Sequence, residues 1–154
     1  MKLSMKSDYA LRALLTLVEH YGGEPLSIRE LAARNDIPKR YLEQIMLDLK
    51  GKGWVKSLPG RDGGFLLALP PTEITMGQVI RHFDEVLAPI SCVSANKYEP
   101  CTQEPVCRFR RVLLQVRNLT ARLLDNSTLA KVFSGQPVER EEVFFQGFMG
   151  GAGI

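Results

Sequence analysis

Three cysteines lie close together in the second half of the chain and are the side chains best suited to chemistry. Eight residues separate Cys92 from Cys101, and five separate Cys101 from Cys107. Thiolates bind soft or borderline metals such as zinc, copper(I) and the iron of iron–sulfur clusters. Three thiols can reach one centre if their loop folds back, which Pro100 and Pro105 favour. The spacing therefore indicates iron–sulfur or other metal binding, with thiol redox sensing and unreactive free cysteines as alternatives.

The same spacing restricts the kind of site. The chain has no CxxC pair, which argues against a zinc ribbon or a thioredoxin-like motif. Three thiolates also leave a fourth ligand to come from elsewhere. A Cys–His enzyme built from Cys92 and His82 is the weakest alternative, because neither of the two histidines lies in a recognisable nucleophile motif. We therefore expect no enzymatic activity.

The cysteines must be positioned by a long irregular segment, residues 86–106, and by the helix after it. Loops of that length in a compact domain usually have a function. The helix is predicted from about Val106 to Asp125, and its apolar stripe comprises Phe109, Val112, Leu113, Val116, Leu119, Leu123 and Leu124. This helix has little of its own domain to pack on, so we expect it to pair with a second copy in a homodimer. A cofactor-binding or intradomain helix is the alternative.

Residues 26–67 form a second functional region, with the pattern of a helix-turn-helix followed by a β-hairpin. Ser27 is a plausible N-cap of the first helix, and Asn35 and Asp36 suit the turn. The second helix is predicted from Pro38 to Lys50. The apolar positions of the two helices are Leu26, Ile28, Leu31, Ala32, Leu42, Ile45, Met46 and Leu49. Two strand-like runs, 54–57 and 65–67, then flank a basic, glycine-rich tip.

Positive charge is concentrated in this region, because residues 38–61 contain six Lys or Arg and two acids. Long basic and amide side chains near a helix N-terminus suit phosphates and base edges in a DNA major groove. An arginine at a hairpin tip suits a minor groove. The alternative is a solvated basic face without a nucleic-acid partner. The candidate DNA contacts are Ser27, Lys39, Arg40, Tyr41, Glu43, Gln44, Lys56 and Arg61.

The rest of the chain supplies supporting helices. One is predicted from Ser7 to Tyr21, with Asp8 in its first turn, where a carboxylate interacts well with the helix dipole. Thr75 is expected to cap a helix from Met76 to Asp84. A short helix over 126–133, capped by Asn126 or Ser127, completes the set, and the glycine-rich tail is expected to be disordered, above all beyond Gln146.

Composition is that of one core with one appended element: 154 residues, 45% apolar, with a net charge of +3. No apolar run approaches membrane-spanning length, and the charged start lacks the apolar centre of a signal peptide. An odd number of cysteines argues against a disulfide framework. A cytoplasmic location without membrane contact is therefore expected.

Taken together, four segments resemble the winged-helix iron–sulfur regulators that include IscR and NsrR. They are MKLSMKSDYALRALL, YLEQI, PGRDGGFLL and the C-x8-C-x5-CRFRR stretch. The resemblance implies a mainly α fold with a small β-hairpin, in which a winged helix-turn-helix domain is joined to a long dimerisation helix. It also implies that Cys92, Cys101 and Cys107 ligate an iron–sulfur cluster, either 2Fe-2S or 4Fe-4S.

The fourth ligand differs between branches of that family. The IscR-like branch has a histidine three residues after the last cysteine, where this chain has Arg110. The NsrR-like branch uses a carboxylate at the start of the first helix of the other subunit, and Asp8 matches that position. The resemblance therefore implies Asp8 as the fourth ligand. Tyr41, Glu43 and Gln44 match DNA-reading positions, whereas Pro59 occupies the place of the usual wing arginine and Arg61 is its nearest substitute.

The expected organisation follows from these observations. Residues 1–84 form the winged DNA-binding domain, 85–107 the cysteine-bearing loop, 106–133 the dimerisation helix with a short terminal helix, and 134–154 a disordered tail. The expected function is a homodimeric regulator that binds a palindromic DNA operator under control of an iron–sulfur cluster. A winged-helix regulator without a cluster, responding to thiol oxidation or a metabolite, is the alternative.

Overall fold

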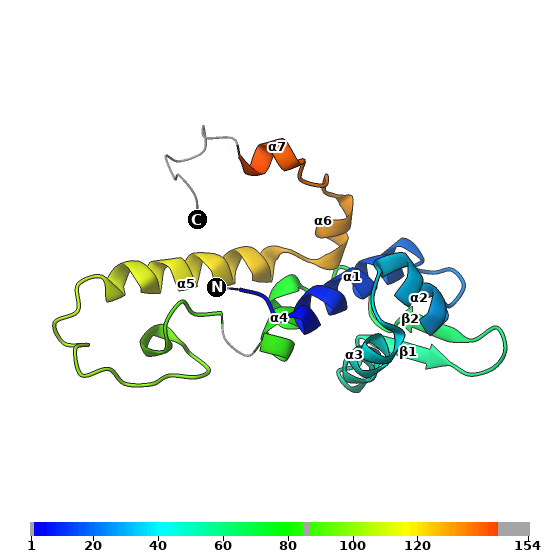
Figure 1. Cartoon of the computed structure of the whole chain (residues 1–154), viewed down its shortest axis with the longest axis horizontal. Helices are drawn as coiled ribbons and strands as arrows, with labels where there is room; N and C mark the ends of the chain where they lie inside the picture. The colour runs from blue at the N-terminus through cyan, green and yellow to red at the C-terminus, as the bar shows by residue number, and fades with distance from the viewer. Residues whose placement is uncertain (1, 85–86, 145–154) are drawn as a thin grey trace.

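The computed structural model describes residues 2–84 and 87–144 and is mainly helical, with one β-hairpin (Figure 1). The N-terminal part contains α1 (Met5–Glu19), α2 (Ile28–Asn35), α3 (Lys39–Gly51), β1 (Val55–Leu58), β2 (Gly64–Leu67) and α4 (Met76–Asp84). The C-terminal part contains the 3-10 helix η1 (Ser91–Val93), α5 (Arg110–Asn126), α6 (Leu129–Ser134) and α7 (Arg140–Val143). The expected fold class is confirmed: a helix-turn-helix with a hairpin wing is joined to a long additional helix.

The N-terminal core is built around α1, which packs against α2, α3, α4, α6 and β2. The Ser4 side chain caps this helix, because its Oγ accepts a hydrogen bond from the Ser7 N–H at 3.2 Å. The prediction that the helix starts at Ser7 is wrong, since Ser7 lies inside the first turn and is fully buried. Ala10 and Leu14, both fully buried, and Leu17 continue the buried face. A helix with neighbours on so many sides fixes the orientation of the other elements.

The predicted helix-turn-helix is present as α2 and α3. Ser27 caps α2, with its Oγ accepting from the Glu30 N–H at 3.2 Å, and Asp36 turns the chain at a left-handed φ of 52°. Pro38 is the residue just before α3 rather than its first helical residue. All four predicted apolar positions of α3 are fully buried, and they are Leu42, Ile45, Met46 and Leu49. The opposite face of α3 is therefore left to solvent.

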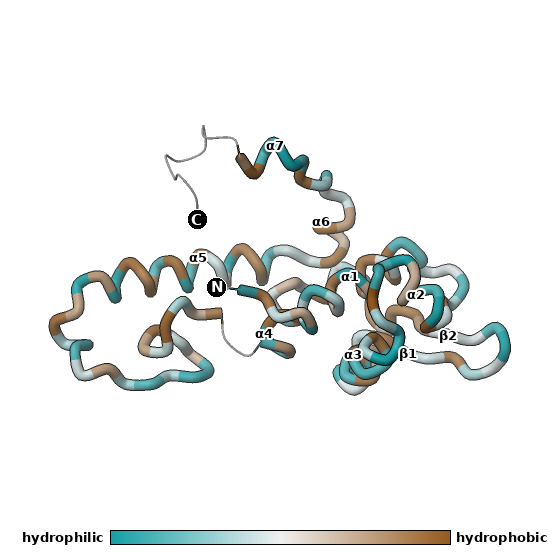
Figure 2. Tube along the Cα trace, in the orientation of Figure 1, coloured by the Kyte–Doolittle hydropathy of each residue, from teal (hydrophilic) through white to brown (hydrophobic). Residues whose placement is uncertain are grey.

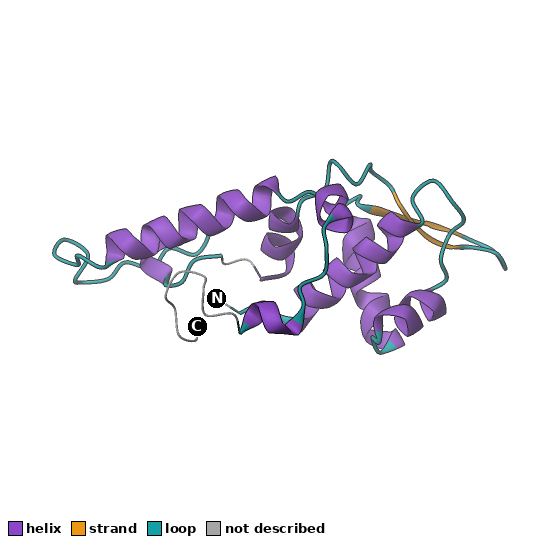
Figure 3. Ribbon diagram, turned by 90° about the horizontal axis from the view of Figure 1, so that it is seen from above, coloured by secondary structure: helices purple, strands orange, loops and turns teal. Residues whose placement is uncertain are grey.

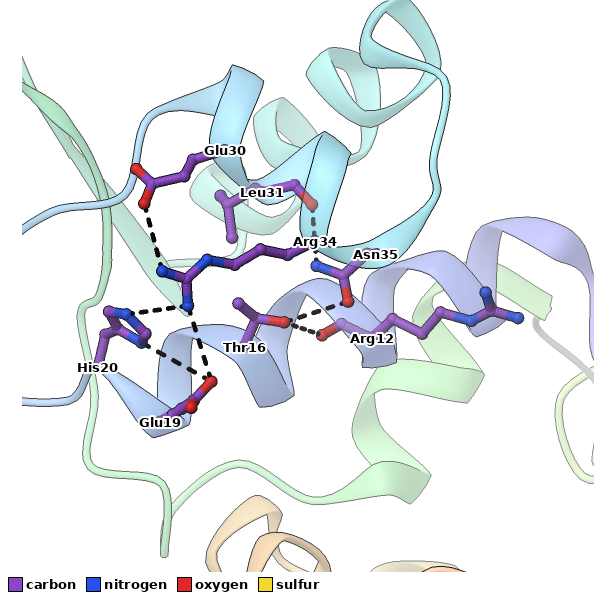
Figure 4. A network of polar contacts seen from close by, with 8 residues as sticks. All are labelled: Arg12, Thr16, Glu19, His20, Glu30, Leu31, Arg34 and Asn35. Atoms are coloured by element: carbon purple, nitrogen blue, oxygen red, sulfur yellow. Dashed lines mark hydrogen bonds and ion pairs between the residues drawn. The ribbon is translucent and has the colours of Figure 1, made fainter.

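A polar network fixes α2 against α1 (Figure 4). The Thr16 hydroxyl donates to Asn35 Oδ1 at 3.1 Å, and the Asn35 amide donates to the Leu31 carbonyl at 2.9 Å. At the C-terminal end of α1, one turn beyond Thr16, the Arg34 guanidinium lies 3.9 Å from the Glu19 carboxylate. These contacts set the angle of the helix-turn-helix relative to the helix that carries the core.

The wing is an antiparallel pair in which Val55 faces Leu67 and Leu58 faces Gly64. A third segment joins it, because Leu26 and Phe65 exchange backbone hydrogen bonds of 3.1 and 2.8 Å. Gly64 lies so close to this segment that a β-carbon there would overlap the Leu26 carbonyl. The first residues of β2 are thus fastened to the segment that precedes α2.

The chain returns to this core after α5. The Leu129 N–H donates to the Ile74 carbonyl at 2.8 Å, the Met76 N–H donates to the Ser127 carbonyl at 2.9 Å, and Leu129 is fully buried. The cap of α6 is Thr128, whose side chain accepts from the Lys131 N–H. The expected cap at Asn126 or Ser127 is therefore wrong, because the backbone of Ser127 is paired with α4 instead.

The long helix α5 begins at Arg110, four residues after the predicted start at Val106, and extends away from the winged part (Figures 1 and 3). The helix α7 lies in the tail expected to be disordered, and the Glu139 N–H donates to the Glu142 carboxylate at 2.9 Å at its start. The stretch beyond Gln146 lies outside the described residues. Among those that are described, no helix is long and apolar enough to cross a bilayer.

The close approach at the wing gives a stability test. Gly64→Ala is expected to lower the free energy of unfolding by about 2 kcal/mol, because the added methyl group has no space beside the Leu26 carbonyl. Gly51→Ala is the matched control, since a β-carbon at that position would have no neighbouring atom within 4 Å and alanine favours helices. Urea unfolding followed by circular dichroism measures both. Equal stability of the two variants would contradict the close packing of β2 on this segment.

Candidate functional site

The outward face of α3 carries the side chains that sequence patterns assigned to DNA. Lys39, Arg40, Tyr41, Glu43 and Gln44 are all exposed. Lys39 Nζ lies 3.6 Å from Glu43 Oε1, one helical turn away. The negative charge of Glu43 is therefore partly balanced within α3, and the face presents a net positive charge with an amide and a phenol.

An aromatic contact connects this face with α1. The Tyr9 and Tyr41 rings meet edge to face with centroids 5.6 Å apart, and the Arg12 guanidinium lies 5.6 Å from the centre of the Tyr9 ring. A mostly apolar groove of about 530 Å³ runs beside them, lined by Met5, Lys6, Tyr9, Pro38, Arg40, Tyr41 and Gln44. The start of α1 and the exposed end of α3 thus form one continuous surface.

The wing extends that surface. Lys56 and Arg61 are exposed, and Arg61 follows Gly60, which turns the tip at a φ of 108°. Lys50 Nζ donates to Ser57 Oγ at 2.6 Å and ties α3 to β1. Arg61 is therefore at the hairpin tip as predicted, whereas Ser27 is half-buried and its hydroxyl oxygen already caps α2.

The base of the wing is connected to α4 by aromatic rings. The His82 ring meets Trp54 edge on at 5.7 Å and Phe83 at 4.7 Å. Burial, together with the nearby positive charge of Lys52, lowers the pKa of His82 from its ordinary value. The lowered pKa favours the neutral ring, through which α4 packs against Trp54 before β1.

The three cysteines are free thiols that line one open cavity of about 630 Å³ beside the start of α5. Cys101 is exposed, whereas Cys92 and Cys107 are half-buried. In residues 2–84 and 87–144, however, no three His, Cys, Asp or Glu side chains are arranged to hold a metal ion. The soft donors and the space suit a thiolate-bound cluster, but the loop does not form a closed ligand set in a single chain.

A hydrogen-bond network organises the backbone around this cavity. Arg110 donates to the Cys92 carbonyl from Nε at 3.2 Å and from Nη2 at 2.7 Å, and its Nη2 lies 3.2 Å from Glu104 Oε2. Glu104 also accepts from the Tyr98 hydroxyl at 2.8 Å and from the Cys101 N–H at 3.2 Å. The bond from Tyr98 lowers the pKa of Glu104, and the same contact raises the pKa of Tyr98.

Asp8 lies elsewhere. It is in the first turn of α1, and its Oδ2 is 2.7 Å from the Arg12 guanidinium, with a second bond of 3.2 Å from Arg12 Nε. The described lining of the cysteine cavity does not include it. Asp8 and the cysteines are therefore not brought together within one chain, and the assignment of Asp8 as a ligand from a second chain stays a prediction.

Most of the predicted apolar stripe of α5 is uncovered, whereas Leu113 is half-buried and Leu124 packs against the core. Val112 is 58% exposed, Leu119 63% and Leu123 66%, and Figure 2 shows hydrophobic residues recurring along this helix. No described residue of α5 is buried. Because isolated apolar side chains on a surface are ordinary but a stripe along a whole helix is not, this face has the character of an interface.

Sequence reasoning missed Tyr98 and Glu104 and treated Arg110 only as a missing histidine. One signal was present: Glu104 is three residues after Cys101 and three before Cys107, so a turn on either side brings its carboxylate back to the cysteine backbone. Arg110 gave no such signal, because its bond to Cys92 spans 18 residues.

Comparison with known proteins agrees with the fold. Residues 3–135 match the Rrf2 family, described as an iron-dependent transcriptional regulator. The chain is similar to the HTH-type transcriptional regulator NsrR of Geobacillus kaustophilus, with 37% identity over 130 residues, covering 84% of this chain and 88% of that protein. It is also similar to the HTH-type transcriptional regulator CymR of Bacillus subtilis, with 30% identity over 145 residues, covering 94% of this chain and 99% of that protein.

Solved structures show the same likeness. CymR of B. subtilis, described as the global cysteine regulator of that organism, superposes with a TM-score of 0.73 at 29% identity, covering 87% of this chain and 97% of that chain. IscR of T. potens superposes with a TM-score of 0.66 at 30% identity, covering 86% of this chain and 85% of that chain.

Proposed function

Because this chain belongs to the Rrf2 family of DNA-binding transcriptional regulators and is not an enzyme, we propose that an iron–sulfur cluster controls its binding to an operator. The ligands are Cys92, Cys101 and Cys107, with Asp8 of a second copy as the fourth. One observation carries the proposal: three free thiols open on a single cavity that is separate from the DNA-facing surface. The site that receives the signal is then distinct from the surface whose DNA binding it regulates.

DNA binding is assigned to α3 and the wing. The N-terminal part of α3 enters the major groove, where Arg40 and Gln44 are long enough to reach base edges or phosphates, and Tyr41 packs on the backbone. Lys56 and Arg61 contact the phosphates or the minor groove beside it. Lys39 shares its charge with Glu43 and is assigned to positioning rather than to base reading.

The homodimer is assigned to the apolar face of α5. A two-fold axis that runs through this face and sets both copies of α3 on one side of the assembly would meet the requirement of a palindromic operator. The cysteine cavity lies at the start of the same helix, next to Phe109, which is 66% exposed. Ligation by Asp8 of the second copy would compete with the ion pair of Asp8 to Arg12.

The chemistry of the thiolate site fits a sensor. When bound, an iron–sulfur cluster supplies an iron reactive towards nitric oxide or oxidants, particularly where one ligand is a weakly held oxygen. The cysteine side chains hold the iron and keep residues 92–107 folded against α5. Loss of the iron would free this loop and change the relative orientation of the two winged parts. The fraction of molecules competent to bind DNA would change with it.

A regulator that senses thiol oxidation without a cluster is the second candidate. The observation that favours it is that the three thiols do not form a closed ligand set in the described part of the chain. The similarity to CymR is compatible with this alternative. The two candidates differ in the iron and sulfide content of protein made without air.

Iron content therefore tests the proposal directly. Protein purified anaerobically is expected to be brown and to contain iron and sulfide, and Cys101→Ala is expected to lose most of both because a cluster needs every thiolate. Thr102→Ala, an exposed neighbour in the same loop, is the control and should keep the iron. Operator binding is then compared between loaded and stripped protein. Colourless wild-type protein, or equal operator binding by the loaded and stripped forms, would contradict the proposal.

DNA contact has its own test. Arg40→Ala combined with Arg61→Ala is expected to weaken operator binding and to reduce the slope of log affinity against log salt by about one for each lost phosphate contact. Arg122→Ala removes an exposed arginine from α5 and should leave that slope unchanged. Fluorescence anisotropy at several salt concentrations measures it. A salt-independent wild-type affinity would argue against phosphate contacts.

The dimer assignment can be tested by adding a charge. Leu119→Glu is expected to convert the protein to a monomer, because a buried unpaired carboxylate opposes association. Asn118→Asp adds the same charge one residue away, on the polar side of α5, and should leave the dimer intact. Sedimentation velocity distinguishes the two. A dimeric Leu119→Glu protein would place the interface elsewhere.

A further inference from the structure

We propose that Glu104 and Arg110 form a latch that positions the cysteine-bearing loop, through Cys92 and Cys101, before any metal binds. The latch comprises the Glu104–Arg110 ion pair and its bonds to the backbones of Cys92 and Cys101. The inference rests on the proposed function in one respect, namely that this cavity receives a cluster. It assigns both residues as positioning groups rather than ligands.

Arg110 fastens the far end of the loop. Its planar guanidinium reaches the Cys92 carbonyl through two nitrogens, at 3.2 and 2.7 Å, and still contacts Glu104 at 3.2 Å. Only an arginine presents several donors in a rigid plane, so one side chain can bridge both partners. Arg110 therefore has a structural role at the position where the IscR-like pattern has a histidine ligand.

Glu104 fastens the near side of the loop. Its carboxylate accepts the Cys101 N–H at 3.2 Å and the Tyr98 hydroxyl at 2.8 Å, in addition to the ion pair. The Glu104 side chain is only 18% exposed, which makes these contacts stronger than those of a fully solvated pair. Because its oxygens are already engaged by three partners, Glu104 is poorly suited to act as the fourth ligand.

The geometry leaves the sulfur atoms available. The latch bonds use the carbonyl of Cys92 and the N–H of Cys101, and the Cys107 N–H donates to the Gln103 carbonyl at 2.8 Å. Each cysteine backbone is thus held while its thiol lines the cavity. Holding the ends of a long loop together removes much of the entropy cost that closing it around a metal would otherwise carry.

The latch is tested in metal-free, reduced protein. Glu104→Gln retains the size and an acceptor oxygen but loses the charge. Arg110→Lys retains the charge but loses the planar group with several donors. Both are expected to speed alkylation of the half-buried Cys92 by roughly three- to tenfold, since charged hydrogen bonds of this kind limit local opening. Cys101, already exposed, should change less. Mass spectrometry after timed alkylation gives the rate for each thiol.

Matched controls separate the latch from charge in general. Glu99→Gln removes an exposed carboxylate from the same loop, and Arg111→Lys changes the exposed arginine next to Arg110. Neither should alter the rate at Cys92. Iron content after anaerobic reconstitution is the second readout, and both latch variants should load more slowly than wild-type protein.

The outcomes distinguish the latch from the proposed function. An unchanged Cys92 rate in both latch variants overturns the latch, whatever the iron content. Faster alkylation accompanied by lost hydrogen-exchange protection in α1 and α3 also overturns it, because the effect would then be general unfolding. Faster alkylation confined to the loop supports the latch even if wild-type protein takes up no iron, in which case the cluster function fails alone. Lost iron without a change in thiol rate would instead identify Glu104 as a ligand.

Discussion

The attachment of α5 to the winged part is the constraint on which the rest of the structure depends. The segment around Ile74 and Met76 pairs through its backbone with the segment between α5 and α6, and Leu129 closes the junction from inside the core. An ion pair between Arg81 and Asp125 adds a side-chain contact at the same place. The C-terminal end of α5 is therefore fixed, whereas its N-terminal end, roughly 25 Å away at 1.5 Å per residue, lies beside the cysteine cavity.

Because of this attachment, a movement of α5 would be transmitted to the DNA-facing surface. The helix α4 packs on both α5 and α1, and α1 packs on α3. The contact of Trp54 with His82 adds a direct connection between wing and α4. Because this chain of contacts is continuous, we expect the winged part and the fixed end of α5 to move together. In the proposed dimer, a change in how two copies of α5 meet would therefore change the separation of the two α3 helices.

Local pattern was enough to predict most of the winged part. The apolar spacing of Leu42, Ile45, Met46 and Leu49 identified the buried face of α3, and Thr75 was correctly expected to cap α4. These features depend on helical periodicity and on residues within one turn. The start of α1 after its cap at Ser4 was placed two residues late, and the cap of α6 at Thr128 was missed because the neighbouring Ser127 has an equally good capping side chain that only tertiary packing distinguishes.

The cysteine region was harder to predict for the same physical reason. The residue types indicated a soft-metal site, and the structure places the three thiols on one cavity. However, the network that organises the loop joins Arg110 to Cys92 across 18 residues, and no periodic pattern in the sequence predicts such a contact. The arrangement of a loop is set by long-range hydrogen bonds, which a local reading of the sequence does not contain.

The cavity itself indicates how a site that is incomplete in one chain can be completed by another. Its walls include Ile90, Val106 and Phe109, whose side chains are 36%, 71% and 66% exposed. Phe109 lies at the start of the same stripe that includes Val112 and Leu119 on α5. A second copy seated on that stripe would bury apolar area and cover the cavity in a single event. In the proposed dimer, then, excluding water from the thiols and pairing the helices are one process. The affinity of the cysteines for iron and the affinity of the two chains for each other must accordingly be coupled, and by the reciprocity of linkage each strengthens the other.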